Sequence, residues 1–449
     1  MRYYFISLSL AAALPSVVLG QGQQGSGSPY SAYGFGELLG STQVVRASMG
    51  GVGIATYDPY GLDPSNPASY TGLIRPVFEA GIAMRTMRFE GASLSTKGNR
   101  TDLLGLSLGI PFKAGRWAVG FGLSPYSDVG YRITSAAPLS TGEGDVRYIY
   151  TGDGGLNKAF FGLAHAWESK RDSLGNGWRV SAGANYNHLF GQLVETRQAI
   201  YPVGGFYNSN ASNRLFLRDG VISLGTQVQS DLVKRVVRSD EGLRFMVGVT
   251  VELGTSLRAD RTQVVNSFSY SASGVELPFD TVQYLNEVAA RVELPVAFGL
   301  GFGVSNAHWS LSMEHRMRDW TKLVADEASG ARVNDLGVQR TTSLGGSFRP
   351  AGDVGGNFWE RTIYRLGFRY MEDYLVVKNT QLDEIGMSFG MSLPVMGSST
   401  RSRLNIGAEL GERGSLENGL LRERFADVYI GISITPDLRE QWFKKRRIE

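Results

Sequence analysis

Apolar residues alternate with glycine, serine or charged residues at a period of two in many separate segments of this chain. In residues 245–253 the apolar set is Phe245, Val247, Val249, Val251 and Leu253. Residues 296–304 and 426–434 repeat the pattern. Successive side chains of a β-strand point to opposite faces, so this period predicts strands with one apolar face. A helical period of 3.6 residues fits none of these segments, and the chain is predicted to be all-β.

Fourteen such segments can be delimited along the chain. The predicted strands are 78–88, 102–112, 116–125, 157–167, 178–192, 216–230, 243–257, 292–304, 308–318, 340–349, 361–371, 385–395, 403–411 and 425–434. Strands of about 9–11 residues match a tilted bilayer crossing, and bacterial barrels have an even strand number. Tryptophans near strand ends, such as Trp117 and Trp309, are typical of an interfacial girdle. We therefore predict a 14-stranded antiparallel transmembrane β-barrel over residues 78–434. A large secreted β-sandwich is the alternative.

The connections between the predicted strands alternate between short and long. Residues 113–115 and 305–307 are short and fall on one parity. The long connections fall on the other parity and comprise 126–156, 193–215, 258–291 and 319–339. Because outer-membrane barrels have short periplasmic turns and longer outer loops, both termini are predicted to be periplasmic.

One long connection contains further pattern. Residues 261–270 could form another strand, but an extra crossing would break the parity, so we place them in an outer loop. Residues 280–291 are predicted to add a short helix there, because Val282, Leu285 and Ala289 have helical spacing.

Composition excludes several functional classes. The 58 glycines follow no collagen period, and cysteine is absent, which excludes disulfides and thiolate metal sites. Four histidines and a net charge of +3 favour neither a metal site nor nucleic acid as a partner. Residues 386–390 match the G-x-S-x-G motif but lie in mid-strand, where a nucleophile elbow cannot form. No enzyme activity, cofactor or metal is predicted.

The ends of the chain differ from the barrel in character. Residues 1–20 are predicted to be a secretory signal peptide, with an apolar stretch from Phe5 to Leu14 before a cut near Gln21. No later run of 18 apolar residues occurs. Residues 435–449 form a basic tail, predicted to be periplasmic, that either contacts anionic lipid or is solvated.

Residues 21–77 precede the barrel and do not alternate. They are rich in glycine, serine, proline and tyrosine, and their apolar and aromatic content predicts that they pack against something. The nearest surface is the barrel lumen, whose glycine and serine lining leaves room for them. We therefore predict an N-terminal hatch that plugs the lumen.

Short motifs in this segment and at the C-terminus resemble a known family. Ser48-Met49-Gly50-Gly51, Asn66-Pro67-Ala68 and the first strand from Phe78 resemble the start of the FadL/TodX/OmpP1 outer-membrane transport proteins. The closing residues 427–434 resemble the Bacteroidota branch of that family. The resemblance implies a 14-stranded barrel that passes long-chain fatty acids or other hydrophobic compounds. It also implies that Asn66, Pro67 and Ala68, near Gly50 and Gly51, form a hatch motif that blocks the lumen at rest.

The predicted lumen face is more charged than an apolar tunnel requires. The charged candidates are Glu314, Arg316, Arg318, Arg361, Arg365, Arg369, Arg403 and Glu409. One interpretation is an ion-pair ladder that holds barrel and plug together. The other is a binding site for an anionic head group such as a carboxylate, which arginine suits through its paired N–H donors.

Two functional hypotheses follow from these features. The first is passive uptake of hydrophobic small molecules, such as long-chain fatty acids, through the outer membrane. The second is a role as barrel subunit or shuttle partner of an outer-membrane secretion or assembly complex. The expected partners are outer-membrane lipid and either a hydrophobic ligand or another protein. A general porin is disfavoured because a plugged lumen of fourteen strands leaves little open channel.

Overall fold

The computed structural model describes residues 27–40, 43–91, 95–113, 115–139, 144–170, 172–173, 176–202, 206–234, 242–271, 273–330, 336–351, 356–395 and 401–436. The predicted signal peptide at 1–20 and most of the predicted tail at 435–449 lie outside these residues. Within the described ranges, no helix is long and apolar enough to cross a membrane.

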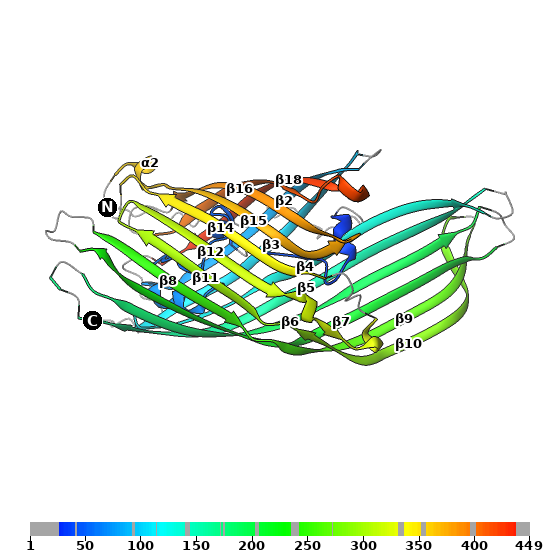
Figure 1. Cartoon of the computed structure of the whole chain (residues 1–449), viewed down its shortest axis with the longest axis horizontal. Helices are drawn as coiled ribbons and strands as arrows, with labels where there is room; N and C mark the ends of the chain where they lie inside the picture. The colour runs from blue at the N-terminus through cyan, green and yellow to red at the C-terminus, as the bar shows by residue number, and fades with distance from the viewer. Residues whose placement is uncertain are drawn as a thin grey trace, which may run out of the picture.

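Fourteen antiparallel strands close into a barrel (Figure 1). They are β2 (Val77–Glu90), β3 (Ser95–Lys113), β4 (Trp117–Pro138), β5 (Asp145–Glu168), β6 (Arg179–Ile200), β7 (Asn208–Val233), β8 (Leu243–Glu252), β11 (Ala297–Ser305), β12 (Trp309–Asp319), β14 (Val338–Phe348), β15 (Ile363–Val377), β16 (Thr380–Pro394), β17 (Arg403–Arg413) and β18 (Arg422–Ile434). The last strand pairs with the first, from Ile434 opposite Phe78 to Arg422 opposite Glu90. The predicted 14-stranded barrel is confirmed.

The alternation along each strand separates an outer apolar face from a lumen face. On β11, Phe298 and Phe302 are about half exposed, while the interleaved Gly299, Gly301 and Gly303 are buried. Trp167 and Trp178, at strand ends, are also about half exposed. Apolar side chains on the outside and small residues inside are what a barrel in lipid requires.

Several strands continue well beyond the barrel as one sheet. The strands β4 to β7 are 22 to 26 residues long, more than a bilayer crossing needs. Two more strands, β9 (Thr255–Tyr270) and β10 (Glu276–Leu294), pair with β7 and with each other. In Figure 1 this sheet extension projects to the right of the barrel. We call this end of the molecule the long-strand end and the opposite end the short-turn end.

The prediction that 261–270 lie in a loop is wrong, because these residues belong to β9. The even number of barrel crossings is nevertheless preserved. Strand β8 pairs with residues 223–233 of β7, and β9 pairs with residues 208–218 of the same strand. β8 and β9 therefore run one after the other along β7, interrupted only at residues 253–254. For this reason β9 adds no further crossing of the membrane.

The predicted helix at 280–291 is also wrong, because these residues lie in β10. Its pairing with β9 contains three register shifts, between Pro278 and Asp280, Thr281 and Gln283, and Leu285 and Val288. Each bulge inserts a residue and resets which face the next side chain takes. A strand interrupted this often can carry apolar residues at the spacing of a helix.

The N-terminal segment lies inside the barrel and has two parts. Residues 27–40, here called the cap segment, contain η1 (Pro29–Ala32) and β1 (Glu37–Leu38), which pairs with β4 at Asp128. Residues 43–76, the plug segment, contain α1 (Val44–Ala47) and η2 (Pro67–Gly72). The remaining short elements are η3 (Trp320–Lys322), β13 (Val324–Ala325), η4 (Glu327–Ser329), α2 (Phe358–Arg361) and η5 (Glu417–Gly419).

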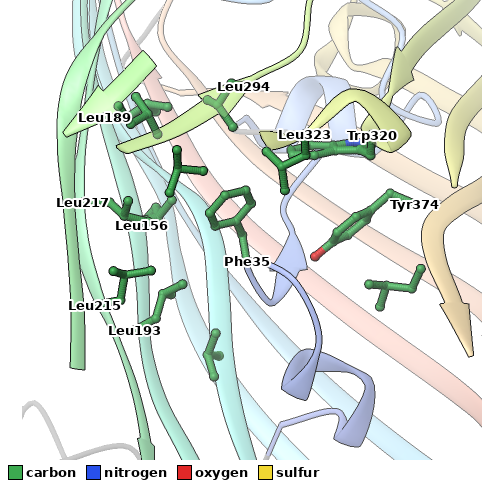
Figure 2. Packing of buried hydrophobic residues seen from close by; sticks show 14 of the residues in the cluster. Phe35, Leu156, Leu189, Leu193, Leu215, Leu217, Leu294, Trp320, Leu323 and Tyr374 are labelled. Atoms are coloured by element: carbon green, nitrogen blue, oxygen red, sulfur yellow. The ribbon is translucent and has the colours of Figure 1, made fainter. Parts of the chain in front are cut away.

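The largest apolar core lies where the cap segment meets the long-strand end. Phe35 stacks obliquely on Trp320, with ring centroids 5.9 Å apart, and Trp320 lies 5.0 Å from Tyr374 (Figure 2). Buried leucines of β5, β6 and β7, such as Leu156 and Leu217, complete the cluster. Burial of these aromatic rings holds the cap segment across the lumen.

Candidate functional site

The plug segment touches the barrel at every strand. Thirteen of the fourteen strands place a glycine against this segment: Gly81, Gly109, Gly120, Gly162, Gly183, Gly225, Gly248, Gly301, Gly345, Gly367, Gly390, Gly407 and Gly431. A side chain at Gly367 would place its Cβ 2.0 Å from the backbone nitrogen of Gly50. We call these thirteen residues the glycine collar. The collar accounts for thirteen of the 58 glycines, because glycine allows the plug segment to approach the strands closely.

The fourteenth strand, β12, contacts the plug segment through an acid. The carboxylate of Glu314 accepts hydrogen bonds from the backbone N–H groups of Gly53, at 2.7 Å, and Ile54, at 2.9 Å. Glu314 is buried and also pairs with Arg316 at 2.8 Å. It therefore satisfies two buried donors that would otherwise have no partner.

The predicted hatch motif is fully buried in this contact. The side chain of Asn66 caps η2 by accepting from the backbone N–H of Ala68 at 3.1 Å. It also donates to the carbonyl of Ile54 at 2.8 Å and to that of Thr226, on β7, at 3.2 Å. Pro67 packs against Gly183. One asparagine thus joins two turns of the plug segment to the barrel wall.

The two predicted hatch glycines have different environments. Gly50 has a positive φ of 67° and lies against the backbone of Phe368, while its N–H donates to Ser388 Oγ at 2.8 Å. Gly51 also has a positive φ, 87°, but open space surrounds it. The serine of the G-x-S-x-G match is therefore an anchor for the plug segment, buried in mid-strand.

The plug segment separates two cavities. The first, about 330 Å³, lies between the plug and cap segments, and we call it the long-strand cavity. Its lining combines Leu38, Leu39 and Leu104 with six basic and five acidic residues. The second, about 270 Å³, lies on the other side near residues 305–308, and we call it the short-turn cavity.

The acids of the long-strand cavity are each paired with an arginine. The arginine–acid pairs are Arg85–Asp427 at 2.8 Å, Arg100–Asp102 at 2.6 Å, Arg316–Glu314 at 2.8 Å, Arg369–Glu409 at 2.6 Å, and Arg318–Glu252. Every acid that lines this cavity therefore has an arginine partner. In this cavity the geometry favours an ion-pair ladder over a binding site for an anionic head group.

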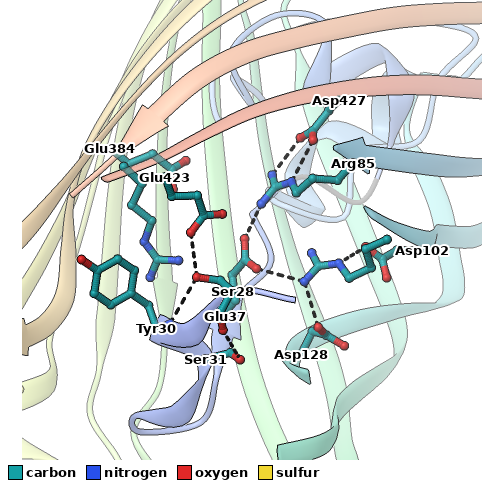
Figure 3. Close-up of polar contacts among 12 residues, drawn as sticks. Ser28, Tyr30, Ser31, Glu37, Arg85, Asp102, Asp128, Glu384, Glu423 and Asp427 are labelled. Carbon is teal, nitrogen blue, oxygen red and sulfur yellow. Dashed lines mark hydrogen bonds and ion pairs between the residues drawn. The ribbon is translucent and has the colours of Figure 1, made fainter. Parts of the chain in front are cut away.

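Glu37 extends this ladder to the cap segment. Its carboxylate contacts Arg85 and lies 3.0 Å from Arg100, which also contacts Asp128 at 2.8 Å (Figure 3). Burial by itself raises the pKa of Glu37, but Arg100 and Arg85 outweigh that effect and hold the pKa well below its ordinary value. Glu37 therefore stays ionised and ties the cap segment to β2 and β3. Glu37 was not among the predicted site residues. Its one local signal is that it is the only charged residue in 27–40, and that signal does not reveal its arginine partners.

The predicted lumen charges do not form one site. Arg316, Arg318, Arg369, Glu314 and Glu409 line the long-strand cavity, whereas Arg365 and Arg403 line the short-turn cavity. The prediction that Arg361 lies on a strand is wrong, because it ends α2. Asn357 and Glu360 form a capping box there, so the helical turn continues to Arg361 and alternation starts at Ile363.

A family model described as BamG matches residues 6–449. No curated protein gives a significant match. Among solved structures, the chain is similar to a Pseudomonas aeruginosa FadL homologue (14% identity, 90% of this chain and 100% of the other, TM-score 0.52). It is also similar to the Ralstonia pickettii toluene transporter TbuX (13%, 88% and 99%, TM-score 0.51) and the CymD monoaromatic hydrocarbon channel (12%, 89% and 99%, TM-score 0.51). At these identities the likeness concerns the fold, and in fold the resemblance to FadL-type barrels is confirmed.

The BamG match spans almost the whole chain, including the plug segment, the glycine collar and the closing strand. The barrel with an apolar outer face and the solved relatives place the protein among outer-membrane β-barrels. The chain therefore belongs to the BamG family and has the fold of the FadL-type outer-membrane channels.

Proposed function

We propose that this protein is an outer-membrane barrel for passive uptake of small hydrophobic molecules, with both termini in the periplasm. The observation that carries the proposal is the cavity of about 330 Å³ between cap and plug segments. Its leucines suit an apolar body, and its paired arginines suit a small polar group. The solved relatives include a monoaromatic hydrocarbon channel and a toluene transporter, which supports the same class of ligand.

Uptake would proceed in two steps. A ligand would enter from the long-strand end past the apolar cluster of the cap segment and occupy the long-strand cavity. It would leave when the plug segment moves around Asn66, Pro67 and Ala68. A ligand drives such a movement only if it binds the displaced state better than the docked state.

Filling the cavity should remove a co-purifying ligand. Gly40 lines the cavity, its φ is not positive, and the nearest atom to an added Cβ is Arg369 Nη1 at 3.6 Å. Gly40→Leu should therefore occupy ligand space without backbone strain, and we expect at least a tenfold loss of bound apolar ligand. Native mass spectrometry and lipid extraction of the detergent-purified barrel measure it.

The matched control for this experiment is Lys97→Leu, which adds the same side chain at an exposed position of β3. It should keep the ligand of the unmodified protein. A ligand-free unmodified barrel, or equal ligand content in both variants, would contradict uptake through this cavity.

A second candidate function is that of a subunit or shuttle partner in an outer-membrane secretion or assembly complex. The observation that favours it is the free edge of the sheet extension. Among the described residues, β10 pairs on its second edge with only two residues of β13, Val324 and Ala325. Residues 276–290 are left with an unpaired edge, and Val282 and Phe279 on it are 75% and 65% exposed. Such an edge can accept an extended segment of a partner protein.

A lysine on this edge should remove the partner. Val282→Lys introduces a charge that opposes strand addition, so a protein co-purified in mild detergent should be lost. Val275→Lys places the same charge at an exposed position next to the hairpin turn and should leave the partner bound. If both variants still bind a stoichiometric partner, the edge is not the binding surface. If no partner is recovered even with the unmodified protein, the result also counts against this function.

A further inference from the structure

The short-turn cavity carries a larger excess of positive charge than the long-strand cavity. Its lining includes five arginines, Arg46, Arg244, Arg349, Arg365 and Arg403, against two aspartates, Asp58 and Asp231. Arg46 pairs with Asp63 of the plug segment at 3.2 Å, and Arg244 pairs with Asp231 at 3.2 Å. Of the other three, Arg349 donates to the backbone carbonyl of Ala307 at 3.4 Å, while Arg365 and Arg403 project from β15 and β17. Asp58 accepts from the backbone N–H of Tyr60 at 2.9 Å.

Arg365 is buried and forms no ion pair with any described residue. Its side chain projects from β15 into the cavity, it is 8% exposed, and its Nη1 donates to Ser392 Oγ on β16. Its Nε has no hydrogen-bond partner. Asp58 lines the same cavity, but no described carboxylate forms an ion pair with Arg365. A buried charge that lacks a partner is costly, which makes an incoming anion favourable.

Arg403 faces the same cavity from β17. Its Nη1 donates to the backbone carbonyls of Arg361 and Ser392, both at 3.3 Å. Those carbonyls orient the guanidinium but do not neutralise it. Within the described chain, Arg403 has no ion pair either, so β15 and β17, which lie on either side of β16, each present an arginine to one space.

A chain of buried polar residues holds this pair in place. Ser392 Oγ, which accepts from Arg365, donates to Asn405, and Asn405 Nδ2 donates to Ser433 at 2.8 Å. Ser433 in turn donates to Glu79 at 2.9 Å, and Glu79 accepts from the backbone N–H of Leu62 in the plug segment at 3.1 Å. The arginine site is therefore built into the barrel wall and connected to the plug segment.

We propose that Arg365 and Arg403 form a binding site for a phosphate-class oxyanion on the short-turn side of the plug segment. Two guanidinium groups with free donors match the several acceptor oxygens of a phosphate or phosphodiester. The source is either free phosphate or the phosphodiester of an anionic lipid head group. This site lies across the plug segment from the cavity proposed for uptake, so it does not depend on that proposal.

An anion at this site should also stabilise the docked plug segment. The same strands β15, β16 and β17 contribute Gly367, Gly390 and Gly407 to the glycine collar. A ligand that neutralises Arg365 and Arg403 only when these strands keep their native positions raises the stability of that state by mass action.

The test is thermal unfolding of the detergent-purified full chain in increasing inorganic phosphate, with chloride at matched ionic strength as reference. We expect a saturable rise in melting temperature that chloride does not produce. Arg365→Gln and Arg403→Gln should each weaken the apparent phosphate affinity at least tenfold. Arg424→Gln, which changes a half-exposed arginine at the long-strand end, should leave it unchanged.

A second measurement separates the two sources. Native mass spectrometry is performed after exchange into micelles with phosphatidylglycerol or, separately, phosphatidylcholine. Preferential retention of phosphatidylglycerol, lost in Arg403→Lys, supports a lipid head group, because lysine keeps the charge but loses the planar fork. Saturable binding of phosphate without lipid retention supports the free anion. No saturable effect of either, or equal effects in Arg365→Gln, Arg403→Gln and Arg424→Gln, would overturn the proposal.

Discussion

Gly345→Leu is expected to turn the closed lumen into an ion-conducting pore. An added Cβ at this position of β14 would lie 2.3 Å from the carbonyl oxygen of Met49 and 2.6 Å from Val52. A backbone atom cannot turn aside as a flexible side chain can, so the plug segment must move. Overpacking of this kind costs about 1–3 kcal/mol, which weakens the docked state. Conductance of single barrels in planar bilayers should rise at least tenfold.

The neighbouring glycine provides a matched control. An added Cβ at Gly346, which points to the other face of the same strand, would lie 3.3 Å from the carbonyl oxygen of Ser310 and meet no atom of the plug segment. Gly346→Leu should therefore conduct like the unmodified protein. If both variants stay closed, the collar does not hold the plug segment, and if both conduct, the effect is a general disturbance of β14.

Glu314→Ala is expected to release the middle of the plug segment. The substitution leaves the N–H groups of Gly53 and Ile54 without an acceptor and removes the partner of Arg316. Each buried donor left unsatisfied costs about 1–3 kcal/mol, so the docked state should lose roughly 2–6 kcal/mol in total. Because 1.4 kcal/mol corresponds to a factor of ten, hydrogen–deuterium exchange at residues 53 and 54 should accelerate by about 30-fold or more.

Two further substitutions on β12 test whether the lost hydrogen bonds of Glu314 cause the faster exchange. Glu314→Gln keeps one acceptor oxygen and the side-chain shape, so its exchange should be intermediate. His315→Ala changes an adjacent residue whose ring contacts Thr342 on the exposed side, and exchange at 53 and 54 should remain slow. Unchanged exchange in Glu314→Ala would mean that the plug segment is held by the glycine collar alone.

The barrel itself could be predicted from local pattern. A period of two over nine or more residues is a property of each strand by itself, and it survives in β11 and β18 because their pairing has no register shift. Where shifts occur, as three times in β10, the period is lost and the prediction turned from strand to helix. Bulges depend on how two strands fit together, and no single segment records them.

The candidate site, like the barrel, was predictable only where a local motif marks it. Asn66, Pro67 and Ala68 were predicted as a hatch motif from their resemblance to a family, and they are buried against β6 and β7. Their partners were not predictable, because Gly183 and Thr226 lie more than a hundred residues away. Glu37 was missed for the same reason, since its significance lies in two arginines on β2 and β3.

The sequence by itself determined a glycine-rich, all-β chain of fourteen alternating strands, a segment before them that had to pack somewhere, and a set of arginines and acids on the inner face. Only the tertiary structure decided which charges meet. Five acids fell opposite arginines in one cavity, while Arg365 and Arg403 fell together in the other without an ion pair to any described residue. The physical reason is that alternation fixes the face of each side chain, whereas the stagger of the closed barrel sets its height in the lumen.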